Sequence, residues 1–473
     1  MTQPRLLLWA ATASFACGFA ALSVLRHEAF ATGRFDLGNM TQAVWSTTQG
    51  RFLETTDLSG TQISRLGAHF DPILAVFAPL WWLWPDPTLF LVTQAVAIAL
   101  GAPAVFLLAR KHLGSERAGL AFALAYLLYP ALQWLVVMEF HPVALATPLL
   151  LWGFWLLDED RLVAFAAVAA VACLTKEHVG LMVAATGLWY AVARGRRRAG
   201  LAIAVAGSAI ALLATAVVVP HYAPGGGSPF ESRYEAVGGS PGGIVETVLT
   251  DPGTVAGEAT EGRDLRYLSQ LLWPLGLLPL LSPASLTAAP ELAANLLSST
   301  RTQTSIHFHY VAGAIPGLVV GAIFAAAWLV RRRPRLLPWV SAGVVVLAAV
   351  ANVRLAPVPA WRHVPGGESL GAREGQVTAH DRVAQRALRL IPPDAAVSAT
   401  NVLGGHLSER RRIFSFPQLR DAAWVAIDET RPSYLDRANA PTLGSAAVRR
   451  LRTDPRWRLV FSENGVLIFR RVD

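Results

Sequence analysis

The sequence predicts a mainly α-helical protein: a polytopic bundle of membrane-spanning helices followed by a small α/β domain outside the membrane. Of its 473 residues, 53% are apolar and only 15% are charged, whereas soluble proteins carry about 25% charged residues. Apolar runs of bilayer-crossing length recur as far as residue 355. Later residues show the shorter patterns of strands and amphipathic helices. These observations exclude a soluble enzyme and a disordered chain.

We expect about eleven spans, because roughly twenty apolar residues cross the hydrocarbon and spans packed inside a bundle can be shorter. They are placed near residues 6–25, 88–110, 118–137, 142–157, 162–175, 179–193, 199–220, 267–282, 284–299, 311–330 and 336–355. Four prolines interrupt the pair at 267–299, which either crosses twice or forms a re-entrant hairpin. The tryptophan- and proline-rich run at 70–84 is expected to lie at the interface.

Arginine-rich loops set the expected orientation. Basic residues cluster at 110–117, 194–198 and 331–335, and such loops face the cytoplasm. The chain is therefore expected in a membrane with its N-terminus cytoplasmic and its C-terminal region outside. These loops carry much of the net charge of +9, and no aromatic-basic groove accompanies it, so nucleic acid is not an expected partner. The two cysteines lie inside apolar runs, which argues against a disulfide framework or a thiolate metal site.

The predicted domains follow from this orientation. Residues 1–355 form the membrane domain, with an interfacial outer loop at 26–87. A glycine-rich outer loop at 221–266 is expected to be mobile, and serves as a substrate lid or as a long connection. A linker at 356–377 leads to an extracytoplasmic α/β domain at 378–473. In that domain we expect helices at 379–390 and 443–453 and strands at 396–400, 412–416, 423–427, 457–462 and 466–471. The last two strands are joined by an Asn-Gly turn.

Candidate site residues occur where spans emerge on the outer face. They are Asp36, His69, Asp71, Glu139, His141, Lys176, Glu177, Arg301, His307, His309 and Tyr310. Ionisable groups at membrane depth are costly and are usually functional or paired. Lys176 is one of only two lysines in the chain, and a compact ammonium suits a phosphate. Structural alternatives remain: Asp36 as a helix cap, Lys176 and Glu177 as an ion pair within the bundle, and the histidines as hydrogen-bonded bystanders.

Several of these motifs carry a family resemblance. In order, they are Phe35–Asp36–Leu37–Gly38, His69–Phe70–Asp71–Pro72, Phe140–His141–Pro142, Thr175–Lys176–Glu177 and His309–Tyr310, with Pro393–Asp394–Ala395 and Phe416–Pro417 in the outer domain. From about residue 30 to its end, the chain resembles the bacterial domain-of-unknown-function 2079 family, which is similar in architecture to the GT-C glycosyltransferases. In those enzymes an aspartate of the first outer loop serves as catalytic base or metal ligand, and Asp36 matches it by position. The family often has an acid after the histidine-proline pair; here Val143 follows, which leaves Glu139 as the nearby acid.

The resemblance implies a membrane glycosyltransferase that uses a polyprenyl-phosphate sugar as donor, with an unknown glycan, lipid or protein as acceptor. Asp36 and Glu139 would be the catalytic carboxylates, and the remaining candidates would bind the donor phosphate or substrate. The one Asp-x-Asp pair, Asp158–Glu159–Asp160, falls in an expected inner loop, so no metal ligand is assigned, although a divalent metal stays open as a cofactor. A single displacement would invert the anomeric carbon. The alternatives are a transporter or flippase for a lipid-linked or anionic substrate, and a scaffold for cell-envelope assembly.

Overall fold

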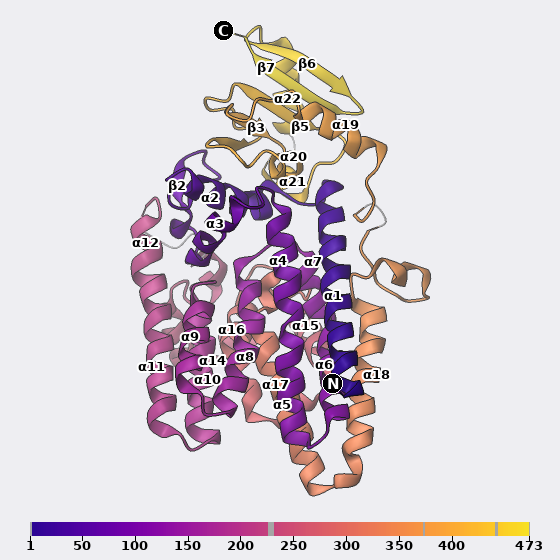
Figure 1. The fold of residues 1–473 in the computed structure, drawn as a ribbon. Coiled ribbons are helices and arrows are strands. Elements are labelled where there is room, and N and C mark those ends of the chain that lie inside the picture. Colours follow the sequence, from indigo (N-terminus) through magenta and orange to yellow (C-terminus); the bar gives the residue numbers. More distant parts are fainter. Residues whose placement is uncertain (1, 226–230, 372–373, 440–442, 473) are drawn as a thin grey trace.

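The fold has two layers, a tall helical bundle and a small sheet-containing domain on one of its ends (Figure 1). The computed structural model describes residues 2–225, 231–371, 374–439 and 443–472. We call the end of the bundle that carries the C-terminal domain the domain side, and the opposite end the arginine side. The helix α1 rises through the bundle to the domain side, so the chain reaches the C-terminal domain early in its course.

Apolar helices build the bundle. They are α1 (Gln3–Glu28), α4 (Thr88–Ala99), α5 (Gly101–Leu113), α6 (Glu116–Leu127), α7 (Pro130–Val137), α8 (Ala146–Asp158), α9 (Leu162–Cys173), α10 (Val179–Ala193), α11 (Arg197–Leu213), α12 (Val219–Tyr222), α15 (Gly262–Leu272), α16 (Ala289–Leu296), α17 (Ala314–Arg332) and α18 (Leu337–Leu355). Five stretches of the described chain are long and apolar enough to cross a membrane, and six if the bent pair α6–α7 counts as one span. The helices α8, α9 and α10 are shorter but equally apolar. The predicted multi-spanning helical bundle is confirmed.

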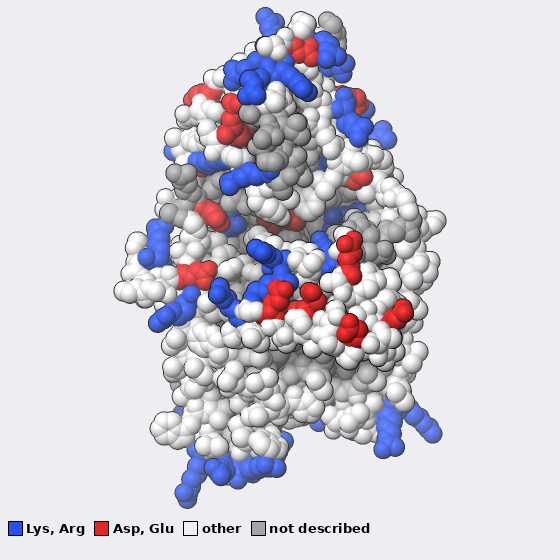
Figure 2. Space-filling view, turned by 180° about the vertical axis from the view of Figure 1, so that it is seen from behind, with Lys and Arg blue, Asp and Glu red and all other residues white. Residues whose placement is uncertain are grey.

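Burial separates central from peripheral helices. The apolar windows of α4–α5 and α17 are 67% and 72% buried, whereas those of α1 and α18 are 28% and 22% buried. The exposed surface of the peripheral helices is apolar, as a lipid-facing surface must be. Figure 2 shows a broad uncharged band above a group of Lys and Arg at the arginine side, with both signs of charge from the middle of the molecule to the C-terminal domain. The loops with the predicted basic clusters follow α5, α10 and α17.

The proline-rich segment 262–296 is a broken hairpin. Between α15 and α16 it forms short 3-10 turns at Trp273–Leu275, Leu278–Leu281 and Pro283–Ala288. Gly276 packs against Leu347 in the middle of α18, and Ser285 packs against Gly321 in α17. Proline removes a backbone donor and ends a helix, so two continuous spans do not form here. Of the two alternatives, the structure resembles the re-entrant hairpin.

The outer segment 26–87 is compact and lies across the domain side. It contains the π-helical turn η1 (Arg34–Gly38), α2 (Asn39–Thr48), the strand pair β1 (Glu54–Thr56) and β2 (Gln62–Ser64), and α3 (Phe77–Trp81) preceded by a 3-10 turn at Pro72–Val76. The ten helical residues 72–81 span about 15 Å, too short for a crossing. This agrees with the expected interfacial segment.

The segment 221–266 has more structure than its glycine content predicts. In its described part it forms a 3-10 turn at Glu231–Val237, α13 (Pro241–Thr250) and α14 (Pro252–Glu258); residues 226–230, which carry part of the predicted mobile loop, lie outside the described residues. The Ser240 and Asp251 side chains accept from Gly243 N and Thr254 N, and a proline follows each cap. These N-terminal caps, which the composition conceals, start both helices.

A five-stranded mixed sheet forms the C-terminal domain. Its strand order is β4-β3-β5-β7-β6, and β3 is parallel to β4 and β5, while β7 is antiparallel to β5 and β6. The elements are α19 (Ala379–Leu388), β3 (Val397–Ala399), α20 (Asn401–Gly405), β4 (Ile413–Ser415), β5 (Trp424–Asp428), α21 (Tyr434–Asn439), α22 (Leu443–Thr453), β6 (Trp457–Glu463) and β7 (Val466–Arg471). Each strand lies within one residue of its predicted range. Asn464 and Gly465 both have positive φ, at 51° and 77°, as a type I′ turn requires.

The arrangement predicts a membrane orientation. Reporter fusions at residues 60, 240 and 420 should report the extracytoplasmic side, and fusions at residues 115, 196 and 333 the cytoplasmic side, because basic loops stay in the cytoplasm. Alkaline phosphatase and green fluorescent protein fusions measure this directly. A cytoplasmic position for residue 420 would contradict the orientation.

Candidate functional site

The turn that carries Asp36 follows the domain-side end of α1. Residues 34–38 form a π-helical turn in which Gly38 N donates to Gly33 O at 3.0 Å. Such wide turns are frequent at functional sites. Asp36 Oδ1 lies 3.4 Å from His141 Nε2, and the Asp36 side chain is 33% exposed, whereas His141 is 7% exposed. The carboxylate is therefore held against the bundle but open on one side.

The contacts of His141 fix how it meets Asp36. Its Nδ1 lies 3.1 Å from the carbonyl oxygen of Met138, so Nδ1 must carry a proton. The ring is thereby oriented with its Nε2 toward Oδ1 of Asp36.

Glu139 binds the backbone of the Asp36 turn from the bundle. Its carboxyl group accepts from Gly33 N at 3.1 Å and from Leu37 N at 2.9 Å, and Glu139 itself has a positive φ of 50°, which is unusual for a side chain of this size. The buried Gln94 secures that strained turn, since its amide donates to Glu139 O at 2.6 Å and accepts from His141 N at 3.0 Å. Sequence reasoning missed Gln94, because a polar residue inside an apolar span gives no sign of its partner.

The two neighbouring carboxyl groups have opposite acidities. Burial, together with the negative charge of Asp36, raises the pKa of Glu139 to about 8. Burial also disfavours ionisation of Asp36, but the contact with His141 and the positive charge of Lys176 outweigh it and lower the pKa of Asp36. Carboxyl groups whose pKa values diverge in this way take different roles in catalysis. Asp36 is the more acidic member, and Glu139 is the less acidic one.

Aromatic rings continue the cluster away from Asp36. The rings of His141 and His309 stack with their centres 3.8 Å apart, and Tyr310 lies 4.2 Å beyond His309. Arg233 Nη1 donates to the Tyr310 hydroxyl at 3.5 Å. Burial and the charge of His141 hold the pKa of His309 well below its ordinary value. Three of the predicted residues thus form one wall, and Arg233 joins it from the glycine-rich outer segment, where no motif predicted it.

Lys176 lies between two separate acid–histidine pairs. Glu177 contacts His69 Nδ1 at 3.1 Å and accepts from Phe70 N at 3.0 Å, and His178 Nε2 lies 2.8 Å from Glu291. Within the described residues the Lys176 ammonium makes no hydrogen bond or ion pair, although its charge influences Asp36 and His69. The alternative in which Lys176 and Glu177 form an ion pair within the bundle is therefore not what the structure shows. A half-buried cation beside the Asp36 turn is left available for an anionic ligand.

Asp71 is neutralised by a residue that the sequence did not single out. Arg65 donates to Asp71 Oδ2 through Nε at 3.0 Å and Nη2 at 2.8 Å, and both side chains are buried. A buried bidentate pair of this kind is structural unless a ligand displaces it. Asp71 therefore fixes the segment that presents His69. Sequence reasoning also missed Glu291, because nothing in the sequence of the proline-rich hairpin indicates that it pairs with His178.

Two predicted phosphate ligands lie apart from this cluster. Arg301 is exposed and makes no hydrogen bond or ion pair within the described residues. His307 points the other way from His309, toward Glu368 at 3.1 Å and the ring of Trp134. His307 lies in a turn and His309 begins the 3-10 turn His309–Val311, so the backbone changes direction between them and sequence spacing alone could not show which histidine faces Asp36.

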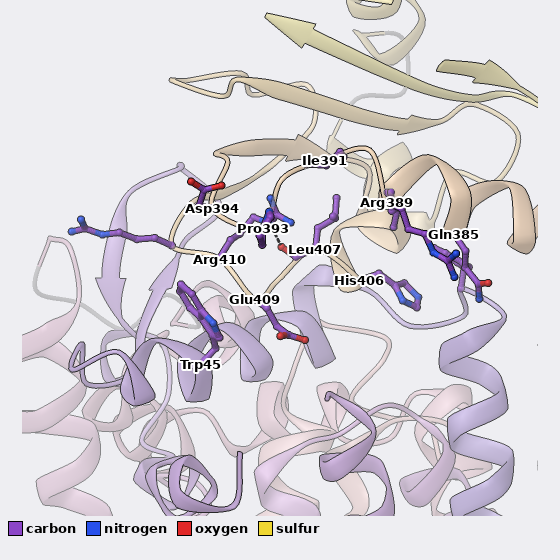
Figure 3. A pocket seen from close by; sticks show the side chains of 13 residues that line it. Trp45, Gln385, Arg389, Ile391, Pro393, Asp394, His406, Leu407, Glu409 and Arg410 are labelled. Atoms are coloured by element: carbon purple, nitrogen blue, oxygen red, sulfur yellow. Dashed lines mark hydrogen bonds between the residues drawn. The ribbon is translucent and has the colours of Figure 1, made fainter. Parts of the chain in front are cut away.

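The described residues contain no group of three His, Cys, Asp or Glu side chains arranged to hold a metal ion. Both oxygens of Glu139 accept backbone amides, whereas Asp36 contacts His141 through Oδ1 alone. A cavity of about 670 Å³ lies elsewhere, between α2 and the C-terminal domain. Figure 3 shows Trp45, His406, Glu409 and Arg389 around it. None of the predicted site residues lines this cavity.

Comparisons with known proteins agree with this architecture. The family model described as "Predicted membrane protein (DUF2079)" matches residues 26–468. Among solved structures, the chain is similar to ArnT from Cupriavidus metallidurans in the apo state, a GT-C glycosyltransferase, with a TM-score of 0.51, 13% identity and 98% of both chains covered. At that identity the likeness shows the fold. No curated protein matches the chain.

The raised pKa of Glu139 predicts a pH-dependent stability. Between pH 4.5, its ordinary pKa, and about 8, the folded protein must hold a proton that the unfolded chain has lost. Stability from this group is complete at lower pH and falls as pH rises toward 8. Glu139→Gln removes the titration, so wild type should lose stability relative to this variant between about pH 5 and 8. Thermal unfolding in detergent measures the difference; a constant difference across this range contradicts a raised pKa.

Proposed function

Because the chain belongs to the DUF2079 family of predicted membrane proteins and has a GT-C architecture, we propose that it is a membrane glycosyltransferase. It transfers a sugar from a polyprenyl-phosphate donor to a glycan, lipid or protein acceptor at the extracytoplasmic face of the bacterial plasma membrane. One observation carries the proposal. Asp36 is a partly exposed carboxyl group with a lowered pKa at the domain end of the bundle, beside the half-buried Lys176, which has no hydrogen-bond or ion-pair partner among the residues that the structure describes.

The proposed reaction is a single displacement. An acceptor hydroxyl attacks the anomeric carbon while Asp36 takes its proton. The bond between the anomeric carbon and the phosphate oxygen breaks, and its electron pair leaves with the polyprenyl phosphate. The configuration at the anomeric carbon inverts. A general base of this kind typically contributes about 10²–10⁴-fold to the rate.

Positive charge stabilises the leaving group in this scheme. Lys176 is the available cation, and the ring wall of His141, His309 and Tyr310 borders the same space. Polyprenyl phosphate is already a stable anion, so the site needs no strong general acid. Glu139, bonded to the backbone of the Asp36 turn, acts as a positioning residue.

Transport is the second candidate, and one observation favours it. The hairpin 262–296 is broken in the bundle, and its buried Glu291 pairs with His178. Broken helices with buried charges form substrate sites in transporters. The other polar candidates gather at one end of the bundle, which is why we favour the enzyme.

Asp36→Asn should reduce sugar transfer by about 10²–10⁴-fold with little change in donor affinity, because asparagine keeps the shape and loses the base. The measurement is turnover of a labelled polyprenyl-phosphate sugar by purified protein. Asp86→Asn is the matched control, since Asp86 is exposed in the same outer segment and only caps Thr88. Equal turnover of wild type and Asp36→Asn removes Asp36 from the chemistry.

Lys176→Ala should weaken donor binding by about 10–150-fold, which corresponds to the roughly 1.5–3 kcal/mol of a hydrogen bond to a charged group. Direct binding of the labelled donor to the purified variant tests this. Lys111→Ala replaces the other lysine, which pairs with Asp158 and Glu159 on the arginine side, and should bind donor like wild type. Unchanged binding by Lys176→Ala would leave Lys176 with a structural role.

A further inference from the structure

The C-terminal domain reaches the backbone of the Asp36 turn directly. Asn401, the first residue of α20, accepts from Phe35 N at 3.1 Å through its Oδ1. Asn401 is itself fixed, because its backbone N donates to Asp436 Oδ1 at 2.8 Å. Phe35 precedes Asp36 by one residue. A hydrogen bond from the separate domain therefore holds the peptide next to the proposed base.

Arg34, which precedes Phe35, is bound to the same domain. Its guanidinium donates to Ile413 O at 3.2 Å and to Ser415 Oγ at 2.6 Å, both in β4, and to Thr56 O at 2.6 Å in the outer segment. The side chain is 5% exposed. An arginine whose donors are satisfied in this way is held in one orientation and links the segments that it contacts.

Two glycines allow the close approach. A Cβ on Gly33 would lie 2.3 Å from Asn401 Nδ2, and a Cβ on Gly38 would lie 2.5 Å from Ser408 Oγ. Glycines at both ends of the turn let the backbone of α20 and its following residues lie against it. The sequence of the turn is thus fitted to the C-terminal domain as well as to the bundle.

These contacts are local and do not result from tight packing along the whole interface. Beside α2 the same interface opens into the cavity of about 670 Å³, where Trp45 faces Glu409 and His406 across open space (Figure 3). At the Asp36 turn the two layers are joined by hydrogen bonds from the two residues that precede Asp36, Arg34 and Phe35. The C-terminal domain is therefore hydrogen-bonded to the segment that carries the proposed base.

We infer that the C-terminal domain completes the active site by holding the Asp36 turn in place, with Asn401 and Arg34 as the positioning residues. This inference rests on the proposed function for its catalytic part. Bundle and domain share the turn: Glu139 fixes Gly33 N and Leu37 N from one side, and Asn401 fixes Phe35 N from the other. A turn released on the domain side would let the carboxylate move, and displacement by about 1 Å can cost 10²-fold in rate.

Hydrogen exchange of the full-length protein in detergent tests the holding role without any substrate. In Asn401→Ala the amides of residues 33–38 should exchange at least tenfold faster than in wild type, because Phe35 N loses its acceptor. Asn401→Asp keeps an acceptor oxygen and should retain protection. Arg386→Ala, which breaks the exposed Arg386–Glu463 pair on the same domain, is the control and should exchange like wild type. Unchanged exchange in a folded Asn401→Ala overturns the inference.

Kinetics then test the catalytic part. Asn401→Ala and Arg34→Ala should lower kcat by roughly 10–100-fold while KM for the donor stays within about twofold; Asn401→Ala is the milder change should Arg34→Ala fail to fold. Faster exchange with an unchanged kcat would overturn the catalytic part. Absence of transfer by wild type would contradict the proposed function, and the exchange result would still decide whether the domain holds the turn.

Discussion

The hydrogen bonds to the backbone of residues 33–38 are the constraint on which the rest of the site depends. Glu139 receives two of these amides from the bundle side, and Asn401 receives a third from the C-terminal domain. The turn that contains Asp36 is therefore hydrogen-bonded to both the helical bundle and the C-terminal domain. Rigid support of this kind is what a general base needs, since its position relative to the reacting atoms sets the rate.

Most acids around the turn are paired, and among the described residues the Lys176 ammonium is left without an acid partner. The acids Glu177, Glu291 and Asp71 are each paired with a histidine or an arginine. Charges near a membrane are costly unless paired, and this pairing accounts for most of them. The Lys176 ammonium has no such partner in the described part of the chain. An unmatched cation at the end of an apolar bundle is a natural place for a lipid phosphate.

How far the sequence could predict this structure depends on the kind of signal. Hydropathy and arginine loops predicted the bundle, and the strand patterns located all five strands of the small sheet, because both depend on local periodicity. The broken segment 262–296 was recognisable from its prolines. The helices α13 and α14 were missed, since glycine content outweighed the signal of their Ser240 and Asp251 caps.

The site was predictable by residue type and less so by contact. Asp36, Glu139, His141, Lys176 and His309 were placed on the outer face, and the structure brings them together. Arg301 and His307 lie apart, because the direction of a side chain in an irregular segment is set by tertiary packing. Gln94, Arg65 and Asn401 were missed entirely: each acts through a partner distant in sequence, and a single sequence carries no record of such pairs.

The account is tested most directly by incubating purified wild-type protein with a panel of labelled polyprenyl-phosphate sugars. It predicts that one donor is consumed, with release of polyprenyl phosphate and inversion at the anomeric carbon when an acceptor is supplied. If every donor remains intact while the same protein in liposomes moves a lipid-linked or anionic substrate across the bilayer, the protein is a transporter and the account is wrong.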